Sequence, residues 1–247
     1  MSEMASHLRR CDSLASLTPA QLARLEESCR LRKYPRASTV YFPHDESRSI
    51  LLMATGRAKL SHLTAAGKHS TIFFLRPGDL FGELAVCDSG ERDEYCETIA
   101  ASTIIAIPAA ELRLLMRENP DLSLELMTLI GQRRRYIERR LKSVLFSTTR
   151  QKLSRVLLDL AVDYGESAVG SESAATLPQR NSDVVSIRLT IPFSHQELAN
   201  LIGATRETVT ITLGHLRNEG LIYIKRRVIV LIDPERLEKA LSADVGW

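Results

Sequence analysis

The chain has 247 residues, 44% hydrophobic and 26% charged, with a formal net charge of +3. These values are ordinary for a globular protein of one large or two medium domains, and the net charge alone does not indicate a nucleic-acid binder. No apolar run approaches the ~20 residues that span a bilayer, and the N-terminus lacks the basic-then-apolar pattern of a signal peptide. We therefore expect a cytoplasmic protein with no membrane partner.

The charges are unevenly distributed. Between Gly131 and Arg155 there are nine Lys or Arg residues and a single acid, and a second basic cluster spans 225–227. Such clusters are either solvated helix faces or surfaces for an anionic partner. The cysteines show no metal-ligand spacing, so we expect reduced thiols rather than metal or iron–sulfur ligands at four positions: Cys11, Cys29, Cys87 and Cys96.

The N-terminal half changes from helix to strand. Thr18-Pro19 predicts the start of a helix, as N-cap and first-turn proline. From Tyr34 to Ile107, short runs such as STVYF, SILLMA, RAKLSHL and STIFFL are separated by turn residues. Many short strands at near-regular spacing predict a small antiparallel barrel or roll, which could enclose a ligand.

A long helix follows the strands. Asn119-Pro120-Asp121 begins a helical run to about Phe146, and its apolar positions alternate in steps of three and four. This spacing is typical of a coiled-coil seam, so we expect the helix to pair with its copy in a homodimer rather than to pack only on its own domain. The predicted interface consists of Met127, Ile130, Arg134, Ile137, Leu141 and Val144. Arg134 is anomalous in a seam and could pair with Glu138.

The C-terminal part combines helices with a hairpin. A helix is predicted over 149–163, a polar surface loop over 164–183, and a strand in VVSIRLTI. Two short helices, 194–202 and 205–218, are joined by the tight turn Gly203-Ala204. A hairpin follows, LIYI and VIVLI with KRR at its tip, and Asp233-Pro234 begins a last helix. Together they predict a winged helix-turn-helix.

The second of these short helices has two different faces. With ~100° per residue, the apolar residues fall on one arc: Val209, Thr212, Leu213 and Leu216. The opposite arc carries Arg206, Glu207, Thr210, Ile211 and Gly214. In a helix-turn-helix the second helix enters the DNA major groove, so we interpret this arc as the DNA-reading face. The alternative is a purely structural two-helix corner.

The residue types on that face match base edges. An arginine donates two hydrogen bonds to guanine, a carboxylate accepts from cytosine N4, and a methyl group contacts thymine. The first helix begins with residues suited to phosphate contacts. The predicted DNA-binding residues are Ser194, His195, Gln196, Thr205, Arg206, Glu207, Thr210, Ile211 and Arg217, flanked by the 225–227 tip.

Three stretches together carry a family resemblance: RPGDLFGELAV at 76–86, ENPDLSLELMTLIGQRRRYIERRL at 118–141, and SHQELANLIGATRETVTITLGHLRNEGLI at 194–222. In this order the chain resembles the cyclic-AMP receptor protein/FNR (CRP/FNR) family of bacterial transcription regulators. The resemblance implies an α+β protein: a helix and cyclic-nucleotide-binding-like β-roll (1–118), a dimerisation helix (119–147) and a winged-helix DNA-binding domain (148–247). It also implies a homodimer, a twofold-symmetric double-stranded DNA site and RNA polymerase as a partner.

The resemblance also implies an effector pocket, which here departs from the cyclic-AMP-binding pattern. Gly82-Glu83 and Arg92 match the residues that meet ribose and phosphate, but Asp93 replaces a serine and Ile137-Glu138 a Thr-Ser pair. The cysteine arrangement of iron–sulfur members is missing, and no haem motif is found. The predicted pocket is Gly82, Glu83, Leu84, Arg92, Asp93, Ile137 and Glu138. We expect a small anionic effector other than cyclic AMP, a signal read through Cys87 and Cys96, or no pocket at all if Arg92 pairs with Asp93 or Glu94 on the surface.

Two other classes of function compete with a DNA-binding regulator. A cyclic-nucleotide-binding module acting on a protein partner would not need the winged helix. An enzyme could use Ser194-His195 as a nucleophile, but Ser194 is better explained as a helix N-cap and no acid in the sequence completes a triad. The sequence leaves open the effector, the target genes and the choice between activation and repression.

Overall fold

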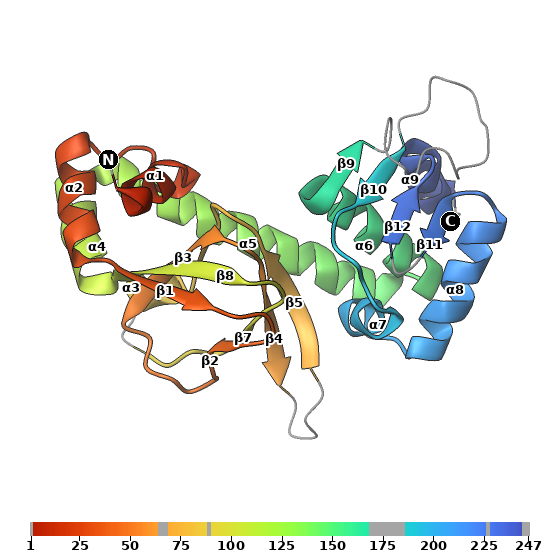
Figure 1. Cartoon of the computed structure of the whole chain (residues 1–247). Coiled ribbons are helices and arrows are strands. Elements are labelled where there is room, and N and C mark those ends of the chain that lie inside the picture. Colours follow the sequence, from red (N-terminus) through yellow and green to blue (C-terminus); the bar gives the residue numbers. More distant parts are fainter. Residues whose placement is uncertain (1, 64–68, 88–89, 168–185, 226–227, 244–247) are drawn as a thin grey trace. The chain divides into compact units, whose positions relative to one another are not determined.

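The computed structural model describes residues 2–63, 69–87, 90–167, 186–225 and 228–243 (Figure 1). The chain forms two compact units, Met1–Ile137 and Glu138–Trp247, and the division falls inside one long helix, α5 (Pro120–Phe146). Because α5 contributes to both units, the predicted division at 118/119 and 147/148 stays a prediction.

The first unit begins with helices. Thr18 caps α2 (Pro19–Ser28) through a reciprocal pair of bonds with Gln21, as the Thr-Pro start predicts. Two elements precede it that the sequence analysis did not predict, α1 (Glu3–Arg9) and the 3-10 turn η1 (Asp12–Leu14). Both are too short for a periodic signal, and each is held by one fully buried leucine, Leu8 or Leu14.

The β-roll consists of two antiparallel four-stranded sheets, which confirms the predicted strand-rich region. The first has the order β1 (Arg30–Tyr34), β8 (Ser102–Pro108), β3 (Ser49–Thr55), β6 (Leu80–Phe81). The second has the order β2 (Thr39–Tyr41), β7 (Tyr95–Thr98), β4 (Ala58–Leu63), β5 (His69–Leu75). A tight turn at Gly56 (φ 81°) joins β3 to β4. A side chain on Gly56 would overlap the Ala101 carbonyl, so only glycine fits.

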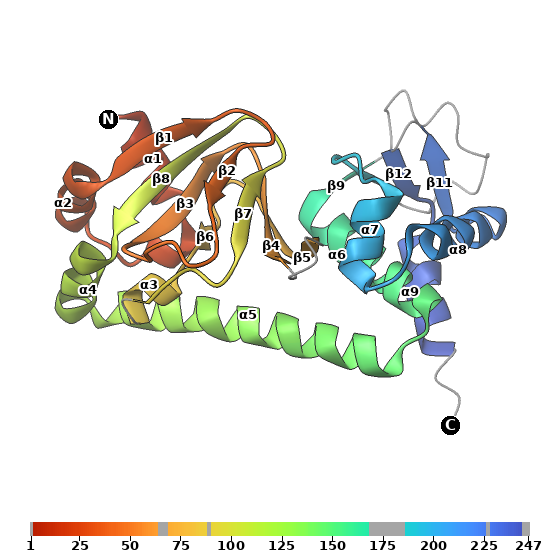
Figure 2. The ribbon, with the colours of Figure 1, turned by 90° about the horizontal axis from the view of Figure 1, so that it is seen from below.

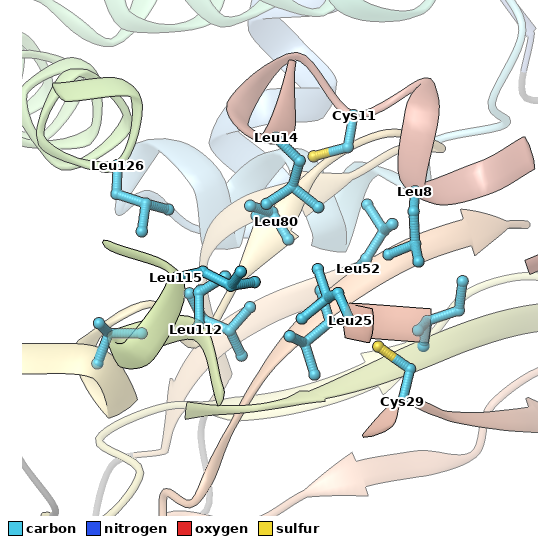
Figure 3. Packing of buried hydrophobic residues seen from close by; sticks show 14 of the residues in the cluster. Leu8, Cys11, Leu14, Leu25, Cys29, Leu52, Leu80, Leu112, Leu115 and Leu126 are labelled. Atoms are coloured by element: carbon cyan, nitrogen blue, oxygen red, sulfur yellow. The ribbon is translucent and has the colours of Figure 1, made fainter. Parts of the chain in front are cut away.

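Strand β3 is buried on both faces, which explains its unbroken apolar run. Ile50 and Leu52 face a core built with α1, α2, α4 (Ala109–Glu118) and the start of α5. Figure 3 shows leucines of these helices packed around Leu52 and Leu80. Leu51 and Met53 instead face a second core inside the roll. Alternate residues of one strand thus belong to two different cores.

The second unit contains the predicted winged helix-turn-helix. Its helices are α6 (Thr149–Tyr164), α7 (His195–Ile202), α8 (Arg206–Asn218) and α9 (Pro234–Ala243). Its antiparallel sheet has the order β11 (Ile222–Lys225), β12 (Val228–Leu231), β10 (Ile187–Leu189), β9 (Gly165–Ser167). Figure 2 shows α7 and α8 as consecutive helices beside this hairpin.

Strand β9 corrects one sequence-based expectation. The stretch 164–183 is predicted as a loop, but Gly165–Ser167 pairs with β10, with Ser167 opposite Ile187. A three-residue edge strand is stabilised by pairing with a strand distant in the chain, and it is too short to show an alternating pattern of apolar residues. Periodicity in the sequence therefore does not reveal it. Residues 168–185, which include the rest of that loop, lie outside the described part of the chain. None of the described helices is long and apolar enough to cross a bilayer.

Candidate DNA-binding surface and sensor site

Helix α7 begins and ends with local signals. The Ser194 hydroxyl accepts a hydrogen bond from the Glu197 backbone N–H at 3.2 Å, and the Glu197 carboxylate accepts one from the Ser194 N–H at 2.8 Å. This capping box confirms the interpretation of Ser194 as an N-cap. At the other end Gly203 adopts φ +67°, the left-handed conformation that lets the chain turn sharply into α8.

Helix α8 has the two faces that its spacing predicts. Its core arc is buried: Val209, Thr212, Leu213 and Leu216. On the opposite arc Gly214 is half-buried, and the other four residues are exposed: Arg206, Glu207, Thr210 and Ile211. Ile211 keeps 60% of its surface accessible. A large aliphatic side chain and two charges thus lie on one solvent-facing side of a helix that is otherwise firmly anchored.

Hydrogen bonds join the start of α7 to the exposed arc of α8. The ring Nδ1 of His195 lies 2.7 Å from the Thr210 hydroxyl, which also donates to the Arg206 carbonyl at 2.9 Å. Gln196 is exposed, and its amide donates to Asn200 along α7. Three predicted DNA-binding residues, His195, Arg206 and Thr210, therefore form one connected group.

The remaining predicted DNA-binding residues lie at the ends of α8 and on the hairpin. Thr205 is the α8 N-cap, and its hydroxyl accepts from the Thr208 N–H at 3.2 Å. Arg217 is exposed in the last turn, about 16 Å from Arg206 along the axis at ~1.5 Å per residue. Lys225 is exposed at the end of β11, whereas Arg226 and Arg227 of the predicted tip lie outside the described residues.

In the sensor region, the structure brings Gly82 and Arg92 into direct contact. Gly82 has φ +67°, and its missing side chain makes room for the Arg92 guanidinium, which a methyl group there would overlap. Arg92 Nη1 donates to the Gly82 carbonyl at 3.1 Å and Nη2 donates to the Ser49 carbonyl. The guanidinium also lies over the Tyr41 ring, 4.8 Å from its centroid. Arg92 is only 6% exposed, which argues against the alternative that it pairs with Asp93 or Glu94 on the surface.

Glu83 has a partner that sequence reasoning missed. Arg133 of α5 forms an ion pair with the Glu83 carboxylate and donates to the Leu80 carbonyl. Both side chains are largely buried, at 16% and 12% exposure. The Arg133 guanidinium also lies 5.6 Å from the centroid of Phe73. In the sequence, Arg133 is noted only as one of the basic residues after Gly131. No residue near it in the sequence indicates that its ion-pair partner is Glu83.

The other predicted pocket residues are exposed, unlike Arg92 and Glu83. Leu84 is 43% exposed on α3 (Leu84–Cys87), and Asp93 is exposed. Ile137 is 50% exposed, and Glu138 is also exposed. Glu94 is half-buried, and burial, followed by the nearby charge of Glu83, raises the pKa of its carboxyl. Two carboxyl groups, those of Glu83 and Glu94, thus lie near the guanidinium of Arg133.

The four cysteines form no disulfide with one another, and their expected state as reduced thiols stays a prediction. Cys96 is fully buried, and burial strongly raises its pKa; burial likewise raises the pKa of Cys11 and Cys29 to about 12. A thiol with a raised pKa is a poor nucleophile. Only Cys87 is exposed. This weakens the expectation that Cys87 and Cys96 read a signal together.

Helix α5 exposes a row of apolar side chains. Met127 is 66% and Leu141 57% exposed, in addition to Ile137. Ile130 is half-buried and Arg134 is exposed; the side chain of Val144 lies outside what the structure describes. Further apolar residues on the same helix are also exposed: Leu124, Leu145 and Phe146.

Two family models match the two functional parts of the chain. A "Crp-like helix-turn-helix domain" matches residues 151–240, and a "Cyclic nucleotide-binding domain" matches residues 31–119. The chain belongs to the CRP/FNR family of transcription regulators. Both the predicted family and the predicted α+β architecture are confirmed.

Relatives of this CRP/FNR regulator cover nearly all of it. The "CRP-like cAMP-activated global transcriptional regulator" of Mycobacterium tuberculosis is 24% identical over 94% of this chain and 97% of its own length. A "Global nitrogen regulator" of Synechocystis is 27% identical over 85% of this chain and 87% of its own length. The solved structure of FixK2 from Bradyrhizobium japonicum has a TM-score of 0.70 at 19% identity, covering 85% and 96% of the two chains. The relatives' names point to different signals, so similarity alone does not identify the effector.

Proposed function

We propose that this CRP/FNR regulator binds a palindromic DNA site as a homodimer in the cytoplasm, with one α8 helix in the major groove of each half-site. The observation that carries the proposal is the exposed arc of α8: Arg206, Glu207, Thr210 and Ile211 face solvent while the opposite arc is buried. Arg206 and Glu207 lie in the first turn, where helix-turn-helix proteins contact base edges. RNA polymerase is the expected partner, as in the family generally.

The homodimer is supported by the exposed row on α5. Large apolar side chains stay 50% or more exposed in a single chain at two places on α5, Leu124 with Met127 and Ile137 with Leu141 and Leu145. Within each group the spacing is three or four residues, which makes a surface suited to a second copy. Two copies related by a twofold axis would present two α8 helices, which explains why the proposed site is palindromic. Half-site centres should then be about one helical turn of DNA apart.

Replacing Arg206 tests the role of α8 in sequence recognition. Arg206→Ala should weaken binding to the selected site by ~1–3 kcal/mol and relax the preference at one G·C pair, because an arginine can bond both acceptors of guanine. Arg217→Ala is the matched control. It should weaken binding to all sequences alike and reduce the salt dependence, as expected for a phosphate contact. Selection from a random DNA pool followed by titration at several salt concentrations measures both effects. An unchanged base preference in Arg206→Ala would show that α8 does not read this base pair.

We further propose that the signal sensed by the β-roll is not cyclic AMP. Supporting this, the two residues that match the family's ribose and phosphate partners are already engaged: Glu83 by Arg133, and Arg92 by two backbone carbonyls. Two buried hydroxyls of the roll, those of Tyr41 and Ser61, have no hydrogen-bond partner among the described residues, so an effector entering the roll would meet unpaired polar atoms there. We retain a small anion as the effector class, since the two carbonyls use two of the five guanidinium N–H groups of Arg92, and a small anion needs neither a base site nor a ribose site.

Cyclic AMP and cyclic GMP should give no saturable binding up to about 1 mM, which corresponds to ~4 kcal/mol of affinity. A ribose and a cyclic phosphate would compete with the contacts of Glu83 with Arg133 and of Arg92 with its two carbonyls, and leaving any of these buried groups unpaired is unfavourable. Calorimetric titration followed by DNA-binding assays makes the test, with the M. tuberculosis cAMP-activated relative as the positive control. Micromolar binding of cyclic AMP with a tenfold gain in DNA affinity, ~1.4 kcal/mol of coupling, would overturn the proposal.

A further inference from the structure

His195 and Thr210 form a contact between the two helices of the helix-turn-helix that involves side chains only. His195 is the first residue of α7, and Thr210 lies on the exposed arc of α8. The His195 Nδ1 and the Thr210 hydroxyl oxygen are 2.7 Å apart. The cap of α7 is provided by Ser194, so this contact is not needed to start the helix.

The hydrogen bonds of Thr210 determine which of the two groups donates in the His195–Thr210 contact. A hydroxyl has one hydrogen, and that of Thr210 is donated to the Arg206 carbonyl at 2.9 Å. The oxygen must therefore accept from His195, which means that the ring carries its hydrogen on Nδ1. With its only hydrogen used inside the helix, the Thr210 hydroxyl cannot donate to a purine N7 or to any other acceptor on a base edge.

The same two bonds select the orientation of the side chain. In a helix a threonine divides between two χ1 rotamers, because its hydroxyl can reach the carbonyl of the preceding turn from either. A second partner on one side, His195, favours a single rotamer and gives the methyl group one fixed position. Of the groups on this exposed side chain, the methyl is the one that the protein does not use.

We infer that His195 is a positioning residue for sequence recognition: it holds Thr210 in the rotamer that presents the methyl group to the 5-methyl group of a thymine. The inference rests on the proposed function, since it assumes that α8 lies in the major groove. It also separates the roles of neighbouring residues. Arg206 reads through hydrogen bonds, while Thr210 reads through an apolar contact whose geometry is set by α7.

The test compares thymine with deoxyuridine, which lacks only the methyl group, at each thymine of the selected half-site. For the wild-type dimer, one position should lose about fourfold in affinity, the amount expected for one buried methyl. Thr210→Ser keeps the hydroxyl but has no methyl, and should abolish the sensitivity at that position. His195→Ala should reduce it to less than twofold. His195→Asn places an amide N–H near the position of Nδ1, and should restore it.

A double-mutant cycle distinguishes positioning from a general structural role. Thr210→Val carries a methyl group in either rotamer, so adding His195→Ala to Thr210→Val should leave the sensitivity unchanged. The inference is wrong if no thymine shows a methyl effect in the wild type, if His195→Ala retains the fourfold effect, or if it removes the effect equally in the Thr210→Val background. Failure of the proposed function would look different: the wild type would select no DNA sequence, or Arg206→Ala would keep the wild-type base preference.

Discussion

Leu141→Asp is expected to convert the proposed dimer into a monomer and to lower affinity for the palindromic site at least 100-fold. The Leu141 side chain is 57% exposed on α5 in the single chain, and the proposed dimer would bury it. Because the twofold axis duplicates the substitution, two unpaired carboxylates would be buried at one interface, which is strongly unfavourable. Loss of the dimer also removes the bivalent advantage, which is typically 10²–10⁴-fold.

Sedimentation and DNA titration measure the two parts of this prediction. Leu114→Asp is the matched control, since Leu114 is 48% exposed but lies on α4, outside the apolar row of α5. That variant should sediment as a dimer and bind DNA normally. A wild-type protein that is monomeric at micromolar concentration, with and without DNA, would contradict both the dimer and the symmetric-site proposal.

Glu83→Gln is expected to destabilise the first unit by about 3 kcal/mol, at the lower end of the range for removing one member of a buried ion pair. The substitution preserves the size of the side chain but leaves the Arg133 charge uncompensated. Arg133 is only 16% exposed, and its remaining partners are the Leu80 carbonyl and the charge of Glu94, which interacts with it electrostatically. Its approach to the Phe73 ring does not replace a full opposite charge.

The free energy of unfolding of the first unit is measured by denaturant titration of the wild type and of Glu83→Gln. Glu118→Gln is the control, because Glu118 pairs with Arg24 at 3.0 Å but both side chains are more than 40% exposed. Exposed pairs contribute little, so that variant should change the unfolding free energy by less than ~1 kcal/mol. Equal effects of the two substitutions would mean that the Glu83–Arg133 pair is not a buried contact in solution.

Most of the candidate DNA surface could be predicted from the sequence because its determinants are local. The faces of α8 follow from a 3.6-residue period, and Ser194 and Gly203 mark the ends of α7 through bonds and backbone angles within a few residues. The length of α5 follows in the same way from its start at Asn119-Pro120 and its apolar spacing. In each case the residues that determine the structure lie within one or two turns of one another.

Contacts between residues that are distant in the chain could be identified only from the tertiary structure. Arg133 and Glu83 are 50 positions apart, and no local pattern indicates that an α5 arginine would meet the turn before α3. Likewise, nothing local indicates that the Arg92 guanidinium is buried against the carbonyls of Gly82 and of Ser49, which is 43 positions away. Strand β9 exists only because β10 pairs with it. Periodicity and capping describe a segment by itself, whereas the partner of a buried charge or an edge strand is chosen when the folded chain brings separate elements together.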